Sequence, residues 1–454
     1  MSGAFNTQND AHYYTREGEA FQASRLSGVM GLLLFNIGEL AILNSGDVSK
    51  PLSGASMSDR EKLLLGPGNA ILIDNGTISK VAPEDEILEE FAPDFSNGKS
   101  DVINLLDVNG NAIIPGLVDC HTHLLWTGDR SNEMHLRQNG STYQEISAQG
   151  GGINQTVTST RKASKQELIS LGRERISQAS IYGTTTIEAK SGYGLSLDSE
   201  IKLLEASSAL TNNNCNVLST WLGAHDFPKE KTKQEYMDEL INIQLPIVSE
   251  NNLAKWVDVF CEPGWFNLEQ TELIVKAAKE LGLRSRLHVD EFVDSNGLNL
   301  AAELGSVSAD HVGFSNQDSR EKAHVSGTMQ VFLPGTPYVL GKDLGNGIND
   351  CLENNWNFSL ATDFNPNCQT LSLPFVASLA THRLGMDPLA ALVACSRNPA
   401  STLNNELKLN VGSIYEGGPA DINILKSKFV DYWCQTPGIS PIEKTFSSGS
   451  IVKS

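Results

Sequence analysis

Short apolar segments alternate with longer helical segments over most of the chain, from Pro115-Gly116 almost to residue 405. The helical segments, such as KQELISLGRERISQASIYG and LEQTELIVKAAKELGL, have apolar spacing near 3.6 and end in glycine, as amphipathic helices do. The apolar segments include GTTTIEAKSGYG, WVDVFCEPG, RSRLHVDEF, VSADHVG and NFSLATDFNP. About seven or eight such strand–helix units predict an α/β fold, a closed (β/α)₈ TIM-like barrel.

The two ends of the chain have β character instead. Between residues 30 and 112, NAILIDNGTISKVAP predicts a strand, an Asn-Gly turn and a second strand, and GSIYEGGPADINILKS near the C-terminus returns to this pattern. We therefore expect a small β-sandwich domain built from both chain ends. The predicted division is a poorly ordered N-terminal extension over 1–30, the small domain over 31–112 and 409–454, and the barrel over 113–408.

Composition excludes several partners and compartments. With 34 basic and 54 acidic residues the formal net charge is −20, which argues against binding nucleic acid or an anionic membrane. The seven cysteines are scattered without a CxxC pair, and the first thirty residues lack the pattern of a signal peptide. The apolar stretch GVMGLLLFNIGELAIL is shorter than a membrane span. These features predict a cytoplasmic protein.

Histidines gather at the predicted strand ends. Five of the nine stand there, and two of them occur one residue apart in DCHTHLLWTGDR. Residues two apart on a strand project to the same face, so His121 and His123 can share one metal ion. His288, which ends RSRLHV, and Asp363, which follows NFSLAT, complete a His₃Asp set with a position open for water. The sequence predicts a single divalent metal ion, Zn²⁺ or Fe²⁺.

Such a metal lowers the pKa of water, and nearby side chains can then move its protons. Asp363 could bind the metal and accept a proton, Glu291 could transfer protons or hold a substrate nitrogen, and His311 could polarise a carbonyl or stabilise an oxyanion. This chemistry predicts hydrolysis of a polarised C–N bond. Lys190 could bridge two metals if carbamylated, but an exposed or ion-paired lysine is the more common situation.

Several longer motifs carry a resemblance to a known family. PGLVDCHTH and GSIYEGGPADINIL are similar to the amidohydrolase superfamily, whose members are metal-dependent barrel enzymes. More specifically, DRSNEMHLRQNGSTYQEISAQGGGINQTVTSTR, IEAKSGYGL, LGAHDFPKE, HVDEF, SADHV and ATDFNPN resemble the imidazolonepropionase family across roughly residues 113–405. The resemblance implies hydrolysis of 4-imidazolone-5-propanoate to N-formimidoyl-L-glutamate in histidine degradation. It also implies a homodimer, as in much of the superfamily.

The resemblance assigns roles residue by residue. It implies metal ligation by the four residues already named, and it places the Arg130 guanidinium on the substrate's propionate carboxylate. Asn367 and Cys368 depart from the pattern of many relatives, so only their backbone groups are expected at the substrate. The implied substrate-binding residues are Arg130, Tyr143, Tyr193, His225, Glu291, Asn365, Asn367 and Cys368.

Two alternatives stay open at this point. A metal-dependent deaminase of a purine, pyrimidine or related ring would use the same metal, acid and base residues, but would release ammonia. Arg130 suits a ring with a carboxylate tail better. The second alternative, a non-catalytic scaffold, predicts a missing ligand or acid/base group, and none is missing from the sequence.

Overall fold

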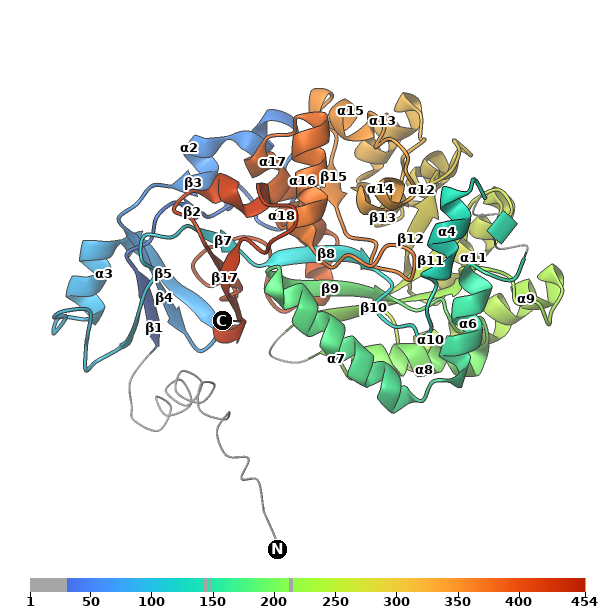
Figure 1. The fold of residues 1–454 in the computed structure, drawn as a ribbon, viewed down its shortest axis with the longest axis horizontal. Coiled ribbons are helices and arrows are strands. Elements are labelled where there is room, and N and C mark those ends of the chain that lie inside the picture. The colour runs from blue at the N-terminus through green and yellow to red at the C-terminus, as the bar shows by residue number, and fades with distance from the viewer. Residues whose placement is uncertain (1–30, 142–144, 147–148, 212–214, 454) are drawn as a thin grey trace, which may run out of the picture.

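The computed structural model describes residues 31–141, 145–146, 149–211 and 215–453 (Figure 1). Its central feature is an eight-stranded parallel sheet whose strands lie side by side in chain order. This order and direction are those of a (β/α)₈ barrel, so the predicted fold class is confirmed. The strands are β8 (Leu117–Thr122), β9 (Thr184–Lys190), β10 (Asn216–Ala224), β11 (Trp256–Cys261), β12 (Arg284–Val289), β13 (Ser308–His311), β14 (Met329–Phe332) and β15 (Phe358–Leu360).

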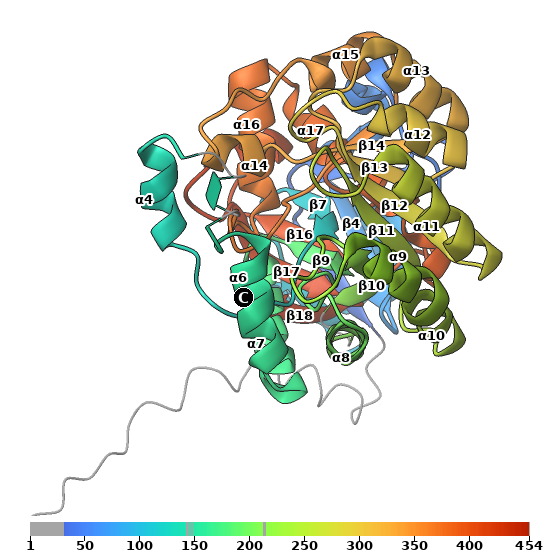
Figure 2. The same ribbon diagram turned by 90° about the vertical axis from the view of Figure 1, so that its right-hand side faces the viewer.

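Helices surround the strands (Figure 2). Within the described residues, no helix is long and apolar enough to cross a membrane. The helices that follow barrel strands are α4 (Asn132–Gln138), α6 (Ile153–Lys162), α7 (Lys165–Ile181), α8 (Leu197–Ser208), α9 (Lys233–Glu239), α10 (Leu245–Glu250), α11 (Leu268–Glu280), α12 (Gly297–Leu304), α13 (Gln317–Ser326), α14 (Gly335–Val339), α15 (Gly347–Glu353), α16 (Leu373–Leu384), α17 (Pro388–Ala394) and α18 (Arg397–Ser401).

Helix α11 shows how the sequence fixes these units. Asn267 caps its start by accepting a hydrogen bond from the backbone N–H of Gln270, whose side chain accepts one from Asn267 in return. Its apolar residues fall at helical spacing, so one face is buried against the sheet, including Ile274, Val275 and Ala278. The helix is therefore held at its start by the cap and along its length by the barrel.

The barrel closes where the first strand meets the segment after the last one. The N–H of Asp363 donates to the carbonyl of His121 at 3.1 Å, and the N–H of His123 donates to the carbonyl of Phe364 at 2.8 Å. A parallel bridge also joins Thr122 and Phe364. These bonds bring the predicted ligands at the two ends of the barrel sequence onto neighbouring backbone segments.

Two smaller sheets flank the barrel, with strand orders β5-β4-β1-β6 and β18-β17-β16-β7-β2-β3. Strand β7 pairs with β16, so Ile113 lies opposite Ile424. Residues from both sheets share one hydrophobic cluster, as in a β-sandwich. The elements are β1 (Leu32–Phe35), β2 (Leu40–Ala41), α2 (Arg60–Leu63), β3 (Leu64–Leu65), β4 (Asn69–Asp74), β5 (Thr77–Pro83), α3 (Glu84–Phe91), β6 (Asn104–Asp107), β7 (Ile113–Pro115), β16 (Ile422–Leu425), β17 (Ile442–Ser447) and β18 (Ser450–Lys453).

Candidate metal centre and active site

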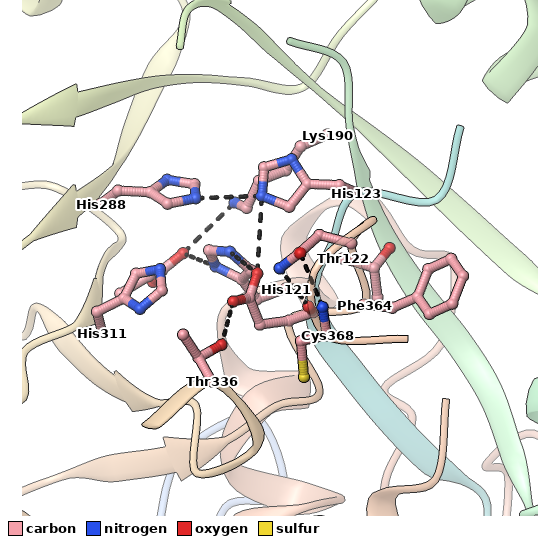
Figure 3. A network of polar contacts seen from close by, with 12 residues as sticks. His121, Thr122, His123, Lys190, His288, His311, Thr336, Phe364 and Cys368 are labelled. Carbon is pink, nitrogen blue, oxygen red and sulfur yellow. Dashed lines mark hydrogen bonds and ion pairs between the residues drawn. The ribbon is translucent and has the colours of Figure 1, made fainter. Parts of the chain in front are cut away.

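The predicted metal ligands lie close together: Figure 3 shows His121, His123 and His288 side by side, and Asp363 lies beside His121 and His123. His123 Nε2 lies 3.3 Å from His288 Nε2, and Asp363 Oδ1 lies 3.5 Å from His121 Nε2 and 3.7 Å from His123 Nε2. All four side chains are buried. His121, His123 and Asp363 form one group of neighbouring ligand atoms, and His121, His288 and His311 form a second. The four predicted ligands come from β8 (His121), the residue after β8 (His123), β12 (His288) and the turn after β15 (Asp363).

The spacing of these atoms fits a divalent metal. At metal–ligand distances of about 2.1 Å, tetrahedral ligand atoms lie about 3.4 Å apart, close to the three separations of 3.3, 3.5 and 3.7 Å. In the described part of the chain, His121 Nε2, His123 Nδ1 and His288 Nδ1 are buried ligand-histidine nitrogens without a hydrogen-bond partner. An unpartnered imidazole nitrogen in a buried site is costly, and a bound cation would satisfy His121 Nε2. The cluster and the fold therefore indicate a divalent metal site.

Two aspartates fix the orientation of the ligand histidines. Asp310 Oδ2 lies 2.7 Å from His121 Nδ1, and Asp258 Oδ2 lies 2.9 Å from His288 Nδ1. An ionised carboxylate only accepts hydrogen bonds, so Nδ1 of His121 carries the proton and its Nε2 presents its lone pair to the centre. The contact of His288 with Asp258 is an ion pair at the same ring nitrogen. Neither aspartate is among the residues predicted from the sequence. An acidic residue inside an apolar strand, as in WVDVFC, was the available signal.

The ammonium group of Lys190 forms ion pairs with both aspartates. This ammonium, at the end of β9, lies 2.8 Å from Asp258, 3.4 Å from Asp310 and 3.1 Å from Glu188, and all four side chains are buried. Burial opposes a charged lysine, but these three carboxylates outweigh it and raise the pKa of Lys190 above its ordinary value. Lys190 is thus the ion-paired lysine, and it connects two ligand histidines through their carboxylate partners.

Replacing Lys190 by Met should weaken metal binding about 10- to 100-fold, the usual cost of losing a residue behind the ligands. Without the ammonium, Asp258 and Asp310 repel each other and no longer hold the two imidazoles in place. Competition with a chromophoric chelator measures the affinity, and circular dichroism checks that the variant is folded. Lys165→Met, an exposed ion-paired lysine on α7, is the matched control. Equal affinity in a folded Lys190→Met protein would contradict this role.

Metal uptake should depend on the protonation of Asp363. Burial raises the pKa of Asp363 to about 6, although a short hydrogen bond from the Thr336 hydroxyl opposes the shift. Burial also holds the pKa values of His121 and His123 well below 6.5, so these rings are neutral at pH 6. The protonated carboxyl that prevails below about pH 6 is a poor metal ligand.

The apparent metal affinity of the metal-free protein should therefore fall about tenfold per pH unit below about pH 6 and level off above it. Isothermal titration with Zn²⁺ between pH 5 and 8 measures this, after correction for buffer ionisation. A flat profile would contradict the assignment to Asp363, and a slope steeper than one proton would show that a ligand histidine also titrates.

Glu291 and His311 face the same centre. Glu291 Oε2 lies 3.6 Å from His311 Nε2, and Glu262 accepts hydrogen bonds from the N–H groups of Glu291 and Phe292. Burial first, then the negative charges of Asp363 and Glu262, raises the pKa of Glu291 well above 4.5. Burial lowers the pKa of His311 well below 6.5, so the ring is neutral. The site thus pairs a carboxyl group that burial shifts toward its protonated form with an imidazole that burial shifts toward its neutral form.

The backbone at these positions is strained. His311 has φ 75° and Asp363 has φ 51°, in the left-handed region that non-glycine residues rarely adopt. His311 is the last residue of β13 and Asp363 lies three residues after β15, and the unusual dihedrals turn their side chains toward the centre. Such outliers concentrate at functional sites, where the surrounding structure must hold them.

One cavity joins the metal cluster to most of the predicted substrate-binding residues. Buried Tyr193 and His225 form one wall, and the Nδ1 of His225 donates to the carbonyl of Gly192 at 2.9 Å. Burial lowers the pKa of His225 to about 3, so its Nε2 is an acceptor. The lining includes His123, Arg130, Tyr193, His225, His288, Glu291, His311, Asp363, Asn365 and Asn367.

Two of the predicted substrate-binding residues, Asn365 and Cys368, have side chains directed into the loop after β15. The amide of Asn365 donates to the Asp363 carbonyl and accepts from the N–H groups of Asn367 and Cys368. Cys368 is fully buried, and its sulfur points away from the histidine rings in Figure 3. Direct substrate contacts by these residues stay predictions. Tyr143 lies outside the described residues.

Comparison with known proteins places this site in a family. No family model matches the chain. The imidazolonepropionase of Symbiobacterium thermophilum is 38% identical over 428 residues, which cover 93% of this chain and 97% of that protein. The imidazolonepropionase of Geobacillus kaustophilus is 36% identical over 412 residues, or 90% and 95% of the two chains.

Solved structures share the fold at lower identity. The 5-methylcytosine deaminase of Klebsiella pneumoniae, liganded with phosphonocytosine, matches with a TM-score of 0.67 at 15% identity, covering 92% of this chain and 97% of that one. An adenosine deaminase from Xanthomonas campestris with bound zinc matches with a TM-score of 0.61 at 16% identity, covering 93% and 92%.

The barrel gives the chain the fold of these solved enzymes, and the buried His–Asp residues at its mouth form a candidate site for a divalent metal ion. The similarity to the two imidazolonepropionases, which extends over nearly their full length, identifies the family. The chain belongs to the imidazolonepropionase family.

Proposed function

We propose that the protein hydrolyses the cyclic amide C–N bond of 4-imidazolone-5-propanoate and releases N-formimidoyl-L-glutamate. The observation that carries this proposal is a single cavity lined by a metal-type cluster and by the buried guanidinium of Arg130. The imidazolone ring and its propionate carboxylate need these two features together. The substrate is a small molecule of the kind named for the curated relatives.

The four residues around the cluster would hold one divalent ion, Zn²⁺ or Fe²⁺, by three histidines and Asp363. Such an ion polarises a carbonyl and lowers the pKa of water. The adenosine deaminase with bound zinc shares the fold, which supports Zn²⁺ as the first ion to test.

Asp363 and Glu291 divide the proton transfers between them. With a pKa near 6, Asp363 is ionised at neutral pH and accepts a proton from the attacking water. Glu291 keeps its proton and donates it to the ring nitrogen as that nitrogen leaves the carbonyl carbon. Carboxyl groups whose pKa values are pushed apart commonly serve as base and acid in this way.

The remaining lining residues hold the ring. His311 is neutral and can donate one hydrogen bond to the carbonyl oxygen as it gains negative charge. His225 Nε2 can accept a hydrogen bond from a ring N–H, and the adjacent ring of Tyr193 limits how the substrate lies in the cavity. Arg130 binds the propionate carboxylate.

The rival activity is deamination of a heterocycle, which the deaminase structures support at the level of the fold. Arg130 argues against it, because a buried guanidinium in the cavity suits a ligand with a carboxylate.

We also propose that the protein is a cytoplasmic homodimer. Each chain would divide into domains between residues 112 and 113 and between residues 408 and 409. The seven free, buried cysteines support a reducing compartment.

The test uses protein loaded with Zn²⁺ or Fe²⁺ and freshly generated 4-imidazolone-5-propanoate. Loss of the ring's ultraviolet absorbance, corrected for spontaneous decay, should be rapid and should yield N-formimidoyl-L-glutamate without ammonia. Metal-free protein is the control, and activity should return with added metal. An intact ring in the presence of metallated protein would overturn the proposal, and ammonia release from aminopurines or cyclic amidines would support the rival.

A further inference from the structure

Glu133 lies directly behind Arg130 and is 2% exposed. Its two carboxylate oxygens accept hydrogen bonds from Nε of Arg130 at 3.0 Å and from Nη2 at 2.8 Å. A carboxylate on the Nε–Nη2 edge fixes the plane of a guanidinium. The direction in which Arg130 faces the cavity is therefore set by Glu133, on the first turn of α4.

The same carboxylate also holds the glycine-rich turn that leads into α6. Glu133 Oε1 accepts a hydrogen bond from the N–H of Gly152 at 2.7 Å. A Cβ on Gly151 would lie 3.0 Å from Glu133 Oε1 and 2.8 Å from Ile146 Cγ2, so a side chain there would push the turn away. Glu133 thus locks α4, Arg130 and this turn together on one side of the cavity.

Arg137, one helical turn further along α4, orients a second cavity residue. Its Nη1 donates to Oδ1 of Asn367 at 2.5 Å, and it lies 3.9 Å from Glu133 Oε2. Arginine has no acceptor atom, so the Asn367 atom facing it must be the carbonyl oxygen. This contact fixes the orientation of the Asn367 side-chain amide. Its NH₂ group is then the hydrogen-bonding group on the side away from Arg137.

Arg130 and Asn367 both line the cavity, and residues of the metal cluster line its other part. A guanidinium and an amide NH₂ group are hydrogen-bond donors, and a carboxylate is a strong acceptor for such donors.

We propose that Glu133 and Arg137 are positioning residues that set the selectivity for a carboxylate-bearing substrate. Glu133 orients the guanidinium of Arg130, and Arg137 turns the amide of Asn367 so that both residues present donors to the same carboxylate. This inference rests on the proposed function, because it concerns how the same cavity recognises the propionate end of its substrate.

The test compares the propanoate substrate with its uncharged analogue, 4-imidazolone-5-propanamide, in the metal-loaded enzyme. Glu133→Gln and Arg137→Met should lower kcat/KM for the propanoate about 10- to 100-fold, mainly through KM, which is the worth of a charge-assisted hydrogen bond. Turnover of the propanamide should change less than about threefold, so the preference for the carboxylate collapses. Arg137→Lys, which keeps a donor to Asn367, should restore most of that preference.

Arg173→Met and Glu174→Gln, two exposed residues on α7, are the matched controls and should behave as the unsubstituted enzyme. Equal losses on both substrates, or an unchanged preference, would overturn the positioning roles. Calorimetry with N-formimidoyl-L-glutamate keeps the two proposals separate. If the protein binds this dicarboxylate but opens no ring, only the proposed function fails. In that case Glu133→Gln and Arg137→Met must still weaken the binding, and unchanged binding overturns the inference.

Discussion

Asp363→Asn should lower kcat by about 10⁴-fold or more, the largest effect expected of any single substitution in this protein. The amide nitrogen or oxygen of Asn is a weaker metal ligand than a carboxylate, and it cannot accept the proton that Asp363 takes at neutral pH. The side chain also sits 3.5 Å and 3.7 Å from two histidine nitrogens, so no other carboxylate can easily replace it.

Metal content and activity should be measured on the same samples. We expect Asp363→Asn to lose most of its metal on gel filtration and to remain inactive when excess Zn²⁺ is added back. Asp343→Asn provides the control, since the side chain of Asp343 is 99% exposed and its loss should leave both quantities unchanged. An Asp363→Asn enzyme that keeps more than about one tenth of the activity would rule out Asp363 as the proton acceptor.

Much of the barrel and its metal cluster could be predicted because strand ends are readable in a sequence. His288 lies near the end of the predicted strand RSRLHV, and the spacing of His121 and His123 is that of one face of a strand. Parallel strands of a barrel end at the same rim, so residues 242 positions apart, such as His121 and Asp363, were expected together. The division of the chain into domains stays a prediction.

The residues that orient the metal ligands and Arg130 could not be predicted from the strand ends. Asp258, Asp310 and Glu133 act through hydrogen bonds and ion pairs to other side chains, and which partners each one meets depends on register and on rotamers. Asn365 illustrates the converse difficulty. Its motif suggests a ligand contact, whereas its amide is used to shape the loop after β15. For Asp258 and Asp310, the only signal in the sequence was a polar residue inside a buried strand.

Glu291→Gln should lower kcat by about 10²- to 10⁴-fold while KM changes less than about threefold, since the residue acts on the leaving nitrogen and not on the carboxylate. Glutamine keeps the size and the hydrogen-bonding reach of the side chain, so Glu262 and His311 should retain their places. It cannot donate a carboxylic proton, and departure of the ring nitrogen then becomes the slow step.

The pH dependence of kcat distinguishes proton donation by Glu291 from a purely steric role. Burial and two neighbouring carboxylates raise the pKa of Glu291 well above 4.5, so its acidic form persists to higher pH than in a free carboxyl group and is lost as pH rises through that pKa. The kcat of the unsubstituted enzyme should therefore fall on the alkaline side, and this limb should be absent from Glu291→Gln because an amide does not titrate. Exposed Glu321 on α13 supplies the matched Glu→Gln control, which should keep the alkaline limb. If Glu291→Gln also keeps it, another group donates the proton, and His311, 3.6 Å away, is the next residue to substitute.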